Sequence, residues 1–275
     1  MKKITLIIGF LLIISSLSFS QDSTGSQGNY QFRKVSQNSF GTGEKMTFGI
    51  YYFGAKAGEA VMEVAPNLEK MNGRDCYKIN VTVKSSSSFD FIYKLDEKYE
   101  CYLDAQGFFP WQYHHNKIQG KYKDNFEAIF DQVNHTAKTY KDDPLVFDKD
   151  VTIPEYVQDQ VSAFYYARTF NIPEMNQWDI ISSFQVFDKD KSKTLETKYL
   201  GREETKVEAG KFKCIMVKPM GMEGGIFGSG DELTIWLTDD VVKMPVKVEV
   251  QIKVGHFNVE LLSYENVKSL TSKIE

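Results

Sequence analysis

The sequence has few of the side chains that metal sites and covalent catalysis use. It contains 3 cysteines and 4 histidines among its 275 residues. No His-x-His, His-Glu-x-x-His or Gly-x-Ser-x-Gly pattern occurs, so the usual sequence signs of a metal centre or a serine hydrolase are missing. His114 and His115 are neighbours, and a regular strand would point them to opposite faces. We therefore predict no catalytic residues, no metal site and no cofactor, and we interpret the histidines as isolated surface or turn residues.

Long apolar runs and an excess of basic residues are also missing. After residue 20, no segment approaches the roughly 20 apolar residues that a transmembrane helix needs. The formal net charge is -4, and there is no basic stripe that would neutralise nucleic-acid phosphates. We therefore expect neither a membrane helix in the mature chain nor a nucleic-acid partner.

The first 20 residues have the three-part organisation of a secretory signal peptide. Lys2 and Lys3 form a short positive segment, residues 4–14 are almost entirely apolar, and the small residue Ser20 stands at the expected cleavage position. The apolar run is too short for a membrane anchor. We predict cleavage between Ser20 and Gln21, and export of the mature chain to the periplasm or out of the cell.

The cysteine positions limit lipidation and disulfide formation. The first cysteine is Cys76, so none follows the predicted cleavage point, and the sequence excludes attachment of a lipid there. Cys76 precedes a predicted strand at 77–83, and Cys101 lies in a later strand. If these strands pair with their apolar faces on one side, Cys76 and Cys101 point to opposite faces. Because Cys214 is remote in sequence, we expect no obligatory disulfide.

Composition and residue alternation divide the mature chain into a leader and a β-rich body. Residues 21–43 are rich in Ser, Gly, Gln and Asn and are predicted to be a flexible leader. From residue 44 onward, apolar and polar residues alternate with a period of two, which is typical of half-buried strands. Asn72-Gly73 predicts a type I′ hairpin turn. The predicted strands are 46–50, 60–64, 77–83, 94–103, 111–117, 122–130, 135–140, 180–187, 194–205, 212–219, 233–238, 246–254 and 257–264.

One segment departs from this alternation. After Pro154, apolar residues recur at helical spacing, and we predict an amphipathic helix at about 157–170. The fold class is therefore mainly β: one large curved antiparallel sheet, or two half-barrels in series, with the helix across the concave face. We predict a single β-rich domain at 44–268, or two lobes with a seam near 145–175, and a tail at 269–275. The alternation also fits an outer-membrane barrel, which the helix and the short strands disfavour.

Several short motifs follow one another in a fairly specific order. They are Gly43-Glu44-Lys45-Met46, Ala57-Gly58-Glu59-Ala60, Asp159-Gln160-Val161-Ser162, Tyr165-Tyr166-Ala167-Arg168, Ile235-Trp236-Leu237, Asp239-Asp240, Met244-Pro245-Val246, Val254-Gly255-His256 and Glu260-Leu261. With these motifs, the chain resembles the exported family called domain of unknown function 3108. The resemblance covers nearly all of the mature chain. It implies an exported, β-rich envelope protein whose curved sheet is similar to that of lipoprotein-localisation carriers, and it implies no activity and no catalytic residues.

Aromatic residues make up 14% of the chain and supply the candidate ligand site. Rings gathered on a curved sheet would line an apolar cavity suited to a lipid or an acyl chain, and the predicted helix would cover it. Ordinary filling of the core is the alternative interpretation. The candidate ligand-binding residues are Phe89, Phe91, Tyr93, Trp111, Phe164, Tyr165 and Arg168.

Arg168 and a glycine-rich segment have two interpretations each. Arg168 continues the apolar stripe of the predicted helix, so it either binds a ligand or is buried in an ion pair with an acid that the sequence does not identify. Residues 221–230 predict a mobile loop, or else a flap over a ligand.

These observations favour a binding function over catalysis. We expect a soluble exported envelope protein that acts as a binding module or carrier for a lipid or another apolar or amphiphilic small molecule. The alternative is a structural or interaction protein that docks on a protein partner in an envelope complex. A hydrolase of envelope polymers is disfavoured, because the sequence offers no nucleophile or metal cluster.

Overall fold

A computed structural model describes residues 30–91, 94–221, 232–251 and 255–274. Residues 32–275 form one compact unit, and the description that follows concerns this unit. The predicted cleavage site at Ser20 and Gln21 lies outside the described residues. The elements are β1 (Lys45–Tyr52), β2 (Ala55–Val64), β3 (Glu69–Met71), β4 (Arg74–Ser85), β5 (Leu95–Asp104), β6 (Pro110–Gln119), β7 (Tyr122–Asp131), β8 (Thr136–Lys141), β9 (Val146–Thr152), α1 (Gln160–Ala167), β10 (Ile180–Asp188), β11 (Lys191–Val207), β12 (Gly210–Met220), β13 (Glu232–Thr238), β14 (Pro245–Gln251) and β15 (His256–Glu265).

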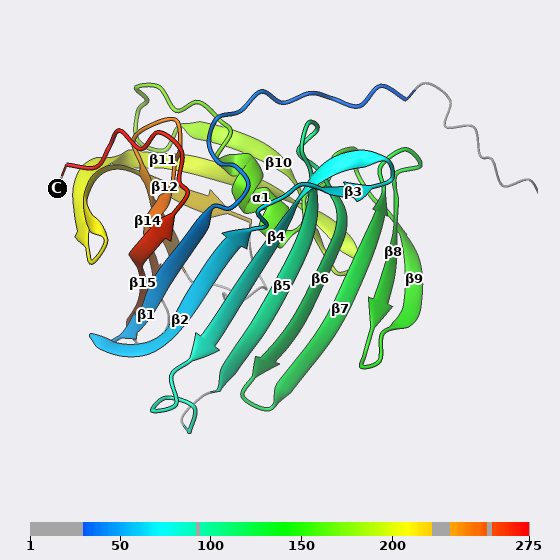
Figure 1. The fold of residues 1–275 in the computed structure, drawn as a ribbon, viewed down its shortest axis with the longest axis horizontal. Coiled ribbons are helices and arrows are strands. Elements are labelled where there is room, and N and C mark those ends of the chain that lie inside the picture. Colours follow the sequence, from blue (N-terminus) through cyan, green and yellow to red (C-terminus); the bar gives the residue numbers. More distant parts are fainter. Residues whose placement is uncertain (1–29, 92–93, 222–231, 252–254, 275) are drawn as a thin grey trace, which may run out of the picture. The chain divides into compact units, whose positions relative to one another are not determined.

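The strands form a single 15-stranded antiparallel sheet, in the order β10-β11-β12-β13-β14-β15-β1-β2-β4-β5-β6-β7-β8-β9, with β3 beside β4. Most strands that follow one another in sequence are neighbours in the sheet; the exceptions are β2 and β3, which both pair with β4, and β9 and β10, which end the strand order on opposite sides. The pairing of β1 with β15 joins the two halves of the chain. Figure 1 shows the sheet bending around α1, which contacts both β5 and β10. The predicted mainly-β class, with a curved antiparallel sheet and one helix, is confirmed, and the single sheet is the arrangement present.

The helix α1 is shorter than the predicted 157–170. It begins after Asp159, whose carboxylate accepts hydrogen bonds from the backbone N–H of Val161 (2.7 Å) and Ser162 (2.9 Å). The Ser162 hydroxyl is in turn 2.8 Å from the Asp159 backbone nitrogen, which completes a capping box. Gln158 cannot join the helix, because its backbone bridges to Val186 of β10. Tertiary pairing therefore sets the start of the helix.

Aromatic rings fill the concave face beside α1. Phe40 is fully buried and lies edge-on to Tyr165 of α1, with 4.7 Å between ring centroids, and to Phe108 at 5.8 Å. Apolar residues of β4 to β8, among them Ile79 and Phe126, belong to the same core cluster. In this part of the described structure the concave face is packed, as the core-filling interpretation of the aromatic residues anticipates.

Segments at both ends of the β-rich body pack against it. In the described part of the predicted flexible leader, Ser39 is 1% and Phe40 is 0% exposed, because the ring of Phe40 completes the core. At the other end, Ser272 of the predicted tail is buried and its carbonyl accepts a 2.9 Å hydrogen bond from the Lys213 N–H. A single buried ring thus holds the described end of a leader that composition alone marks as flexible, and a backbone hydrogen bond holds the tail.

The hairpin and cysteine predictions agree with the observed register. Asn72 and Gly73 have φ of 48° and 76° and join β3 to β4, as a type I′ turn requires. Cys101 pairs with Ile79 across β4 and β5, so odd residues face odd residues and Cys76 points to the opposite face. All three cysteines are buried free thiols.

Candidate functional site

The structure separates the aromatic residues that the sequence grouped together. Phe89 and Phe91 lie in a turn that follows β4, rather than on a strand, and Phe91 is 83% exposed. The strand ends because the Ser85 hydroxyl accepts a 2.8 Å hydrogen bond from the N–H of Leu95 and closes the loop. Tyr93 lies outside the described residues.

The remaining candidates belong to two different core clusters. Trp111 is 3% exposed, packs with Phe109 and Cys76, and donates a 3.1 Å hydrogen bond from Nε1 to Asp104. Tyr165 is fully buried and Phe164 partly buried in the cluster beneath α1. The described residues among these candidates therefore do not line one common cavity.

Arg168 lies at the end of α1 and is buried in an ion pair with Glu44. Its two terminal nitrogens are 2.7 and 2.9 Å from the Glu44 carboxylate oxygens, and it also donates to the carbonyls of Ser39 and Val242. The Arg168 side chain is 1% exposed and that of Glu44 is 0%. Burial alone would lower the pKa of Arg168, but the adjacent Glu44 raises it above its ordinary value. Of the two interpretations of Arg168, the buried ion pair is the one that the structure contains.

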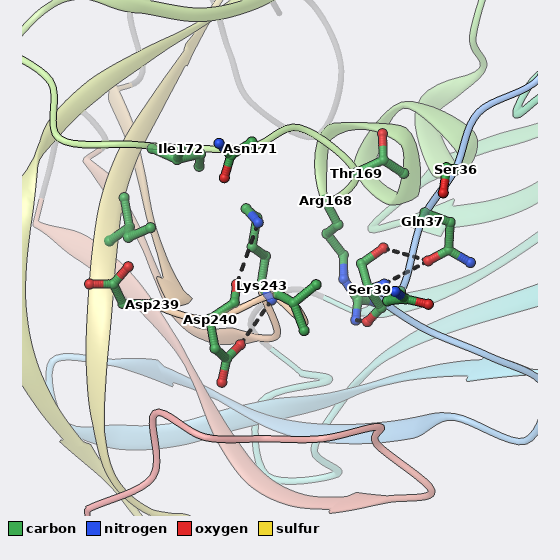
Figure 2. A pocket seen from close by; sticks show the side chains of 13 residues that line it. Ser36, Gln37, Ser39, Arg168, Thr169, Asn171, Ile172, Asp239, Asp240 and Lys243 are labelled. Carbon is green, nitrogen blue, oxygen red and sulfur yellow. Dashed lines mark hydrogen bonds between the residues drawn. The ribbon is translucent and has the colours of Figure 1, made fainter.

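A pocket of about 390 Å³ lies next to this ion pair. Three segments bound it: residues 36–39, residues 168–172 after α1, and residues 239–243 in the turn between β13 and β14, together with Ile215 of β12. Figure 2 shows Arg168 on one side of the pocket and Asp239 on the other, with Lys243 between them. The pocket is within the range of volumes that hold small ligands.

Lys243 places a cation in this pocket. The residue is 6% exposed, and its ammonium makes a single hydrogen bond in the described structure, 3.4 Å to the carbonyl oxygen of Asp240. Figure 2 shows the side chain extending toward the segment that carries Asn171. Burial lowers the pKa of Lys243, while Asp240 and Asp239 act in the opposite direction. A cation that is largely removed from water and lacks a carboxylate within hydrogen-bond distance favours an anionic ligand.

The two neighbouring acids are already engaged. Asp240 accepts hydrogen bonds from the Thr238 hydroxyl and from the backbone N–H groups of Val242, Thr271 and Ser272, at 2.9 to 3.1 Å. Although burial would raise the pKa of Asp240, these donors hold it below its ordinary value. Asp239 pairs with Arg202 at 2.9 Å. The described groups around the pocket therefore leave Lys243 as its least satisfied charge.

A family comparison identifies the chain. The model of a family described as a protein of unknown function, DUF3108, matches residues 47–262. The chain belongs to the DUF3108 family. No curated protein matches it.

Three solved structures are similar to this DUF3108 chain at low sequence identity. A β-barrel-like protein of domain of unknown function DUF1849 from Brucella abortus is 9% identical, with a TM-score of 0.51 over 86% of this chain and 100% of that one. A protein from Bacteroides fragilis, described as exported and with a YmcC-like fold, is 12% identical, with a TM-score of 0.35 over 85% and 99% of the two chains. A protein from Parabacteroides distasonis described as a lipoprotein is 12% identical, with a TM-score of 0.30 over 86% and 100%. The first of these likenesses supports the fold alone.

The described residues of this DUF3108 chain contain neither a metal-binding cluster nor a membrane-spanning helix. No group of three or more His, Cys, Asp or Glu side chains is arranged to hold a metal ion within the described ranges. Across the same ranges, no helix combines the length and the hydrophobicity that are needed to cross a bilayer.

One histidine is not the surface or turn residue that the sequence predicted. His115 is 1% exposed and points into the core from β6, between Tyr113 and Asp124. Because a carboxylate only accepts, Nε2 of His115 carries a proton and donates to Asp124 at 2.9 Å, which leaves Nδ1 to accept from the Tyr113 hydroxyl at 3.1 Å. Burial lowers the pKa of His115 to about 4, so the imidazole is neutral at pH 7.

This buried imidazole makes stability depend on pH. Between pH 6.5 and 4 the unfolded chain binds a proton on His115 that the folded chain excludes, so stability is complete above pH 6.5 and falls as the pH decreases. We expect His115→Gln to remove about 2 kcal/mol of the stability difference between pH 7 and pH 5. Urea unfolding at the two pH values measures it. His114, the partly exposed neighbour of His115, provides the control. His114→Gln should lose as much stability between pH 7 and pH 5 as the wild type does.

Sequence reasoning missed two residues of the pocket region in this DUF3108 chain. Glu44 lies 124 positions from Arg168, and no local pattern reveals which acid reaches across such a distance. Lys243 had a weak signal, because it is a single lysine between the apolar pairs Val241-Val242 and Met244-Pro245. Such a lysine is surrounded by residues that tend to be buried.

Proposed function

We propose that this DUF3108 chain is an exported binding protein of the cell envelope that holds a small amphiphilic molecule with an anionic group. The observation that carries the proposal is the Lys243 ammonium, which lies in a pocket without a carboxylate at hydrogen-bond distance in the described structure. A carboxylate or phosphate of a ligand would supply a charge-assisted partner there.

Apolar groups beside Lys243 support the amphiphilic character of the ligand. Ile172 and Ile215 are buried in the wall of the pocket, and Val241 is 48% exposed at its edge. A ligand whose anionic group meets Lys243 would lay a short apolar portion against these side chains. The volume of about 390 Å³ suits a compact ligand or one end of a longer one.

The location rests on the first 20 residues. Their organisation as a signal peptide supports export, and the presence of Gln21 instead of a cysteine directly after Ser20 supports release without a lipid anchor. Periplasmic or extracellular location then follows for the mature chain. A carrier in such a compartment has to enclose its cargo within its own fold.

Lys243→Met tests the role of the cation with octanoate as the probe. We expect the mature chain to bind octanoate in isothermal titration calorimetry, and the substitution to weaken binding about 10- to 100-fold, because a charged hydrogen bond contributes roughly 1.5–3 kcal/mol. Octanol, which has the same apolar chain without the charge, should bind both forms alike. Methionine has a side chain of similar length and carries no charge that must be buried. The free energy of unfolding should therefore be unchanged or higher.

Lys138→Met is the matched control, because Lys138 is an exposed lysine on β8. It should bind octanoate as the wild type does. Equal affinity of the wild type and Lys243→Met for octanoate would remove Lys243 from the site. If the chain binds neither probe and organic extraction of the purified protein yields no small molecule, the binding function itself is wrong.

A further inference from the structure

Exposed aromatic side chains gather at one edge of the sheet. Because β1, β4 and β6 run in the same direction, the turns that follow them lie at one edge, the lower edge of Figure 1. An exposed ring lies in or beside each turn: Phe53 after β1 is 71% exposed, Phe91 after β4 is 83% exposed, and Tyr122, the first residue of β7, is 51% exposed. We call these three residues the aromatic rim.

Ring contacts connect the first two turns of the rim. Tyr52 lies against Phe53, with 4.5 Å between ring centroids, and 6.4 Å from Phe89 in the turn that also carries Phe91. Tyr52 stacks on Phe257 at 4.7 Å. The rim therefore rests on a layer of partly buried rings, while Phe53 and Phe91 project beyond it into solvent.

Phe53 stands at a backbone position that does not favour a bulky side chain. Phe53 and Gly54 form the two-residue turn between β1 and β2, with φ of 46° and 78°. The turn at Asn72 and Gly73 has nearly the same angles and carries asparagine, the residue that tolerates a left-handed conformation. A bulky aromatic residue is strained there, and although its ring touches Tyr52 and lies beside Gly255, 71% of Phe53 remains exposed. This exposed face favours a contact outside the chain.

Lysines accompany the rings of the rim. Lys84 and Lys94 flank the turn of Phe91, and Lys121 and Lys123 flank Tyr122, and all four are exposed. Within residues 84–91, 94 and 119–123, Asp90 is the only acid that the structure describes. Aromatic rings that enter the headgroup region, with lysine ammonium groups reaching the lipid phosphates, are the combination found at membrane surfaces.

We propose that the aromatic rim docks this protein on the surface of a lipid bilayer, with Phe53 and Phe91 inserted at the level of the headgroups. The proposal is independent of the pocket around Lys243, because the turn between β13 and β14 lies at the opposite edge of the sheet. Insertion of rings supplies the attachment, and the four lysines favour anionic lipids.

Vesicle flotation of the mature chain tests the proposal, with vesicles of phosphatidylcholine alone and of phosphatidylcholine mixed with phosphatidylglycerol. We expect binding to both, and tighter binding to the mixed vesicles. Phe53→Asn and Phe91→Ser should each lower the partition coefficient on both vesicle types about tenfold, because each removes one inserted ring. Phe53→Asn should also keep or raise the melting temperature, since asparagine suits the turn. Weaker binding by a protein that folds at least as well assigns the loss to the ring.

Trp178→Asn is the matched control. Trp178 is also an exposed aromatic residue with positive φ, 51% and 77°, but it precedes β10 at the opposite edge of the sheet. Its substitution should leave vesicle binding unchanged. Undiminished binding by Phe53→Asn and Phe91→Ser, or an equal loss in Trp178→Asn, would overturn the proposal. A rim that instead joins two copies of the chain would appear as a dimer in sedimentation that these variants dissociate, without vesicle binding.

Discussion

Replacing Glu44 by glutamine is expected to lower the free energy of unfolding by about 3–5 kcal/mol, because Arg168 then remains buried without its counter-charge. Both side chains are at most 1% exposed, so water cannot take over the role of the carboxylate. Arg168 also joins the end of α1 to two distant parts of the chain, through Glu44 and the carbonyl of Ser39 in one and the carbonyl of Val242 in the other. Urea unfolding of the mature chain, followed by circular dichroism, measures the loss.

Two further variants separate the buried charge from the packing around it. Glu59→Gln removes the acid of an exposed pair with Lys56, whose side chains are 54% and 43% exposed, and should change stability by less than about 1 kcal/mol. The double variant Glu44→Leu with Arg168→Met leaves no charge unpaired and should recover most of the stability that Glu44→Gln loses. A small effect of Glu44→Gln, comparable to that of Glu59→Gln, would show that the pair does not organise the end of α1.

Alternation with a period of two was sufficient to predict most of the sheet. Strands such as β14, where Val246, Val248 and Val250 alternate with charged residues, have one buried face that the sequence displays directly. β9 was missed because it is an edge strand: Val146 and Phe147 are more than half exposed, and the charged residues Asp148, Lys149 and Asp150 in its middle leave no continuous apolar face. β3 was missed because three residues are too few to show a period.

The candidate sites were harder to predict, because they depend on what folding brings together. Phe91 was assigned to a cavity because, in a strand, it would point to the same face as Phe89. The strand ends at Ser85, however, and beyond it alternate residues no longer share a face. Lys243 and Arg168 approach the same pocket from a turn and from a helix end, and no pattern within either segment reveals their proximity. Local periodicity identifies elements, whereas a pocket is a property of their assembly.

Asp104→Asn is expected to lower the free energy of unfolding by about 3 kcal/mol, because a buried carboxylate that several donors share loses its charge. The Asp104 side chain is 0% exposed and lies 2.5 and 2.9 Å from Nε and Nη2 of Arg74. It also accepts from Nε1 of Trp111 at 3.1 Å and from the Gly107 N–H at 2.6 Å. The amide of asparagine would place donor hydrogens against one of these donors, so the loss exceeds that of a single hydrogen bond.

The pH dependence of Asp104→Asn distinguishes this cause from a loss of packing. Burial would raise the pKa of Asp104, but Arg74, the Gly107 N–H and Trp111 hold it below its ordinary value. The carboxylate therefore stabilises the fold above about pH 4, the pKa of an unfolded aspartate, and this contribution is lost as the pH falls through the folded value. The difference in free energy of unfolding between the wild type and Asp104→Asn should therefore become smaller in acid. If the variant lost stability through poorer packing instead, this difference would be the same at every pH. Asp75→Asn, which removes the exposed partner of Lys70, should change stability by less than about 1 kcal/mol at any of these pH values.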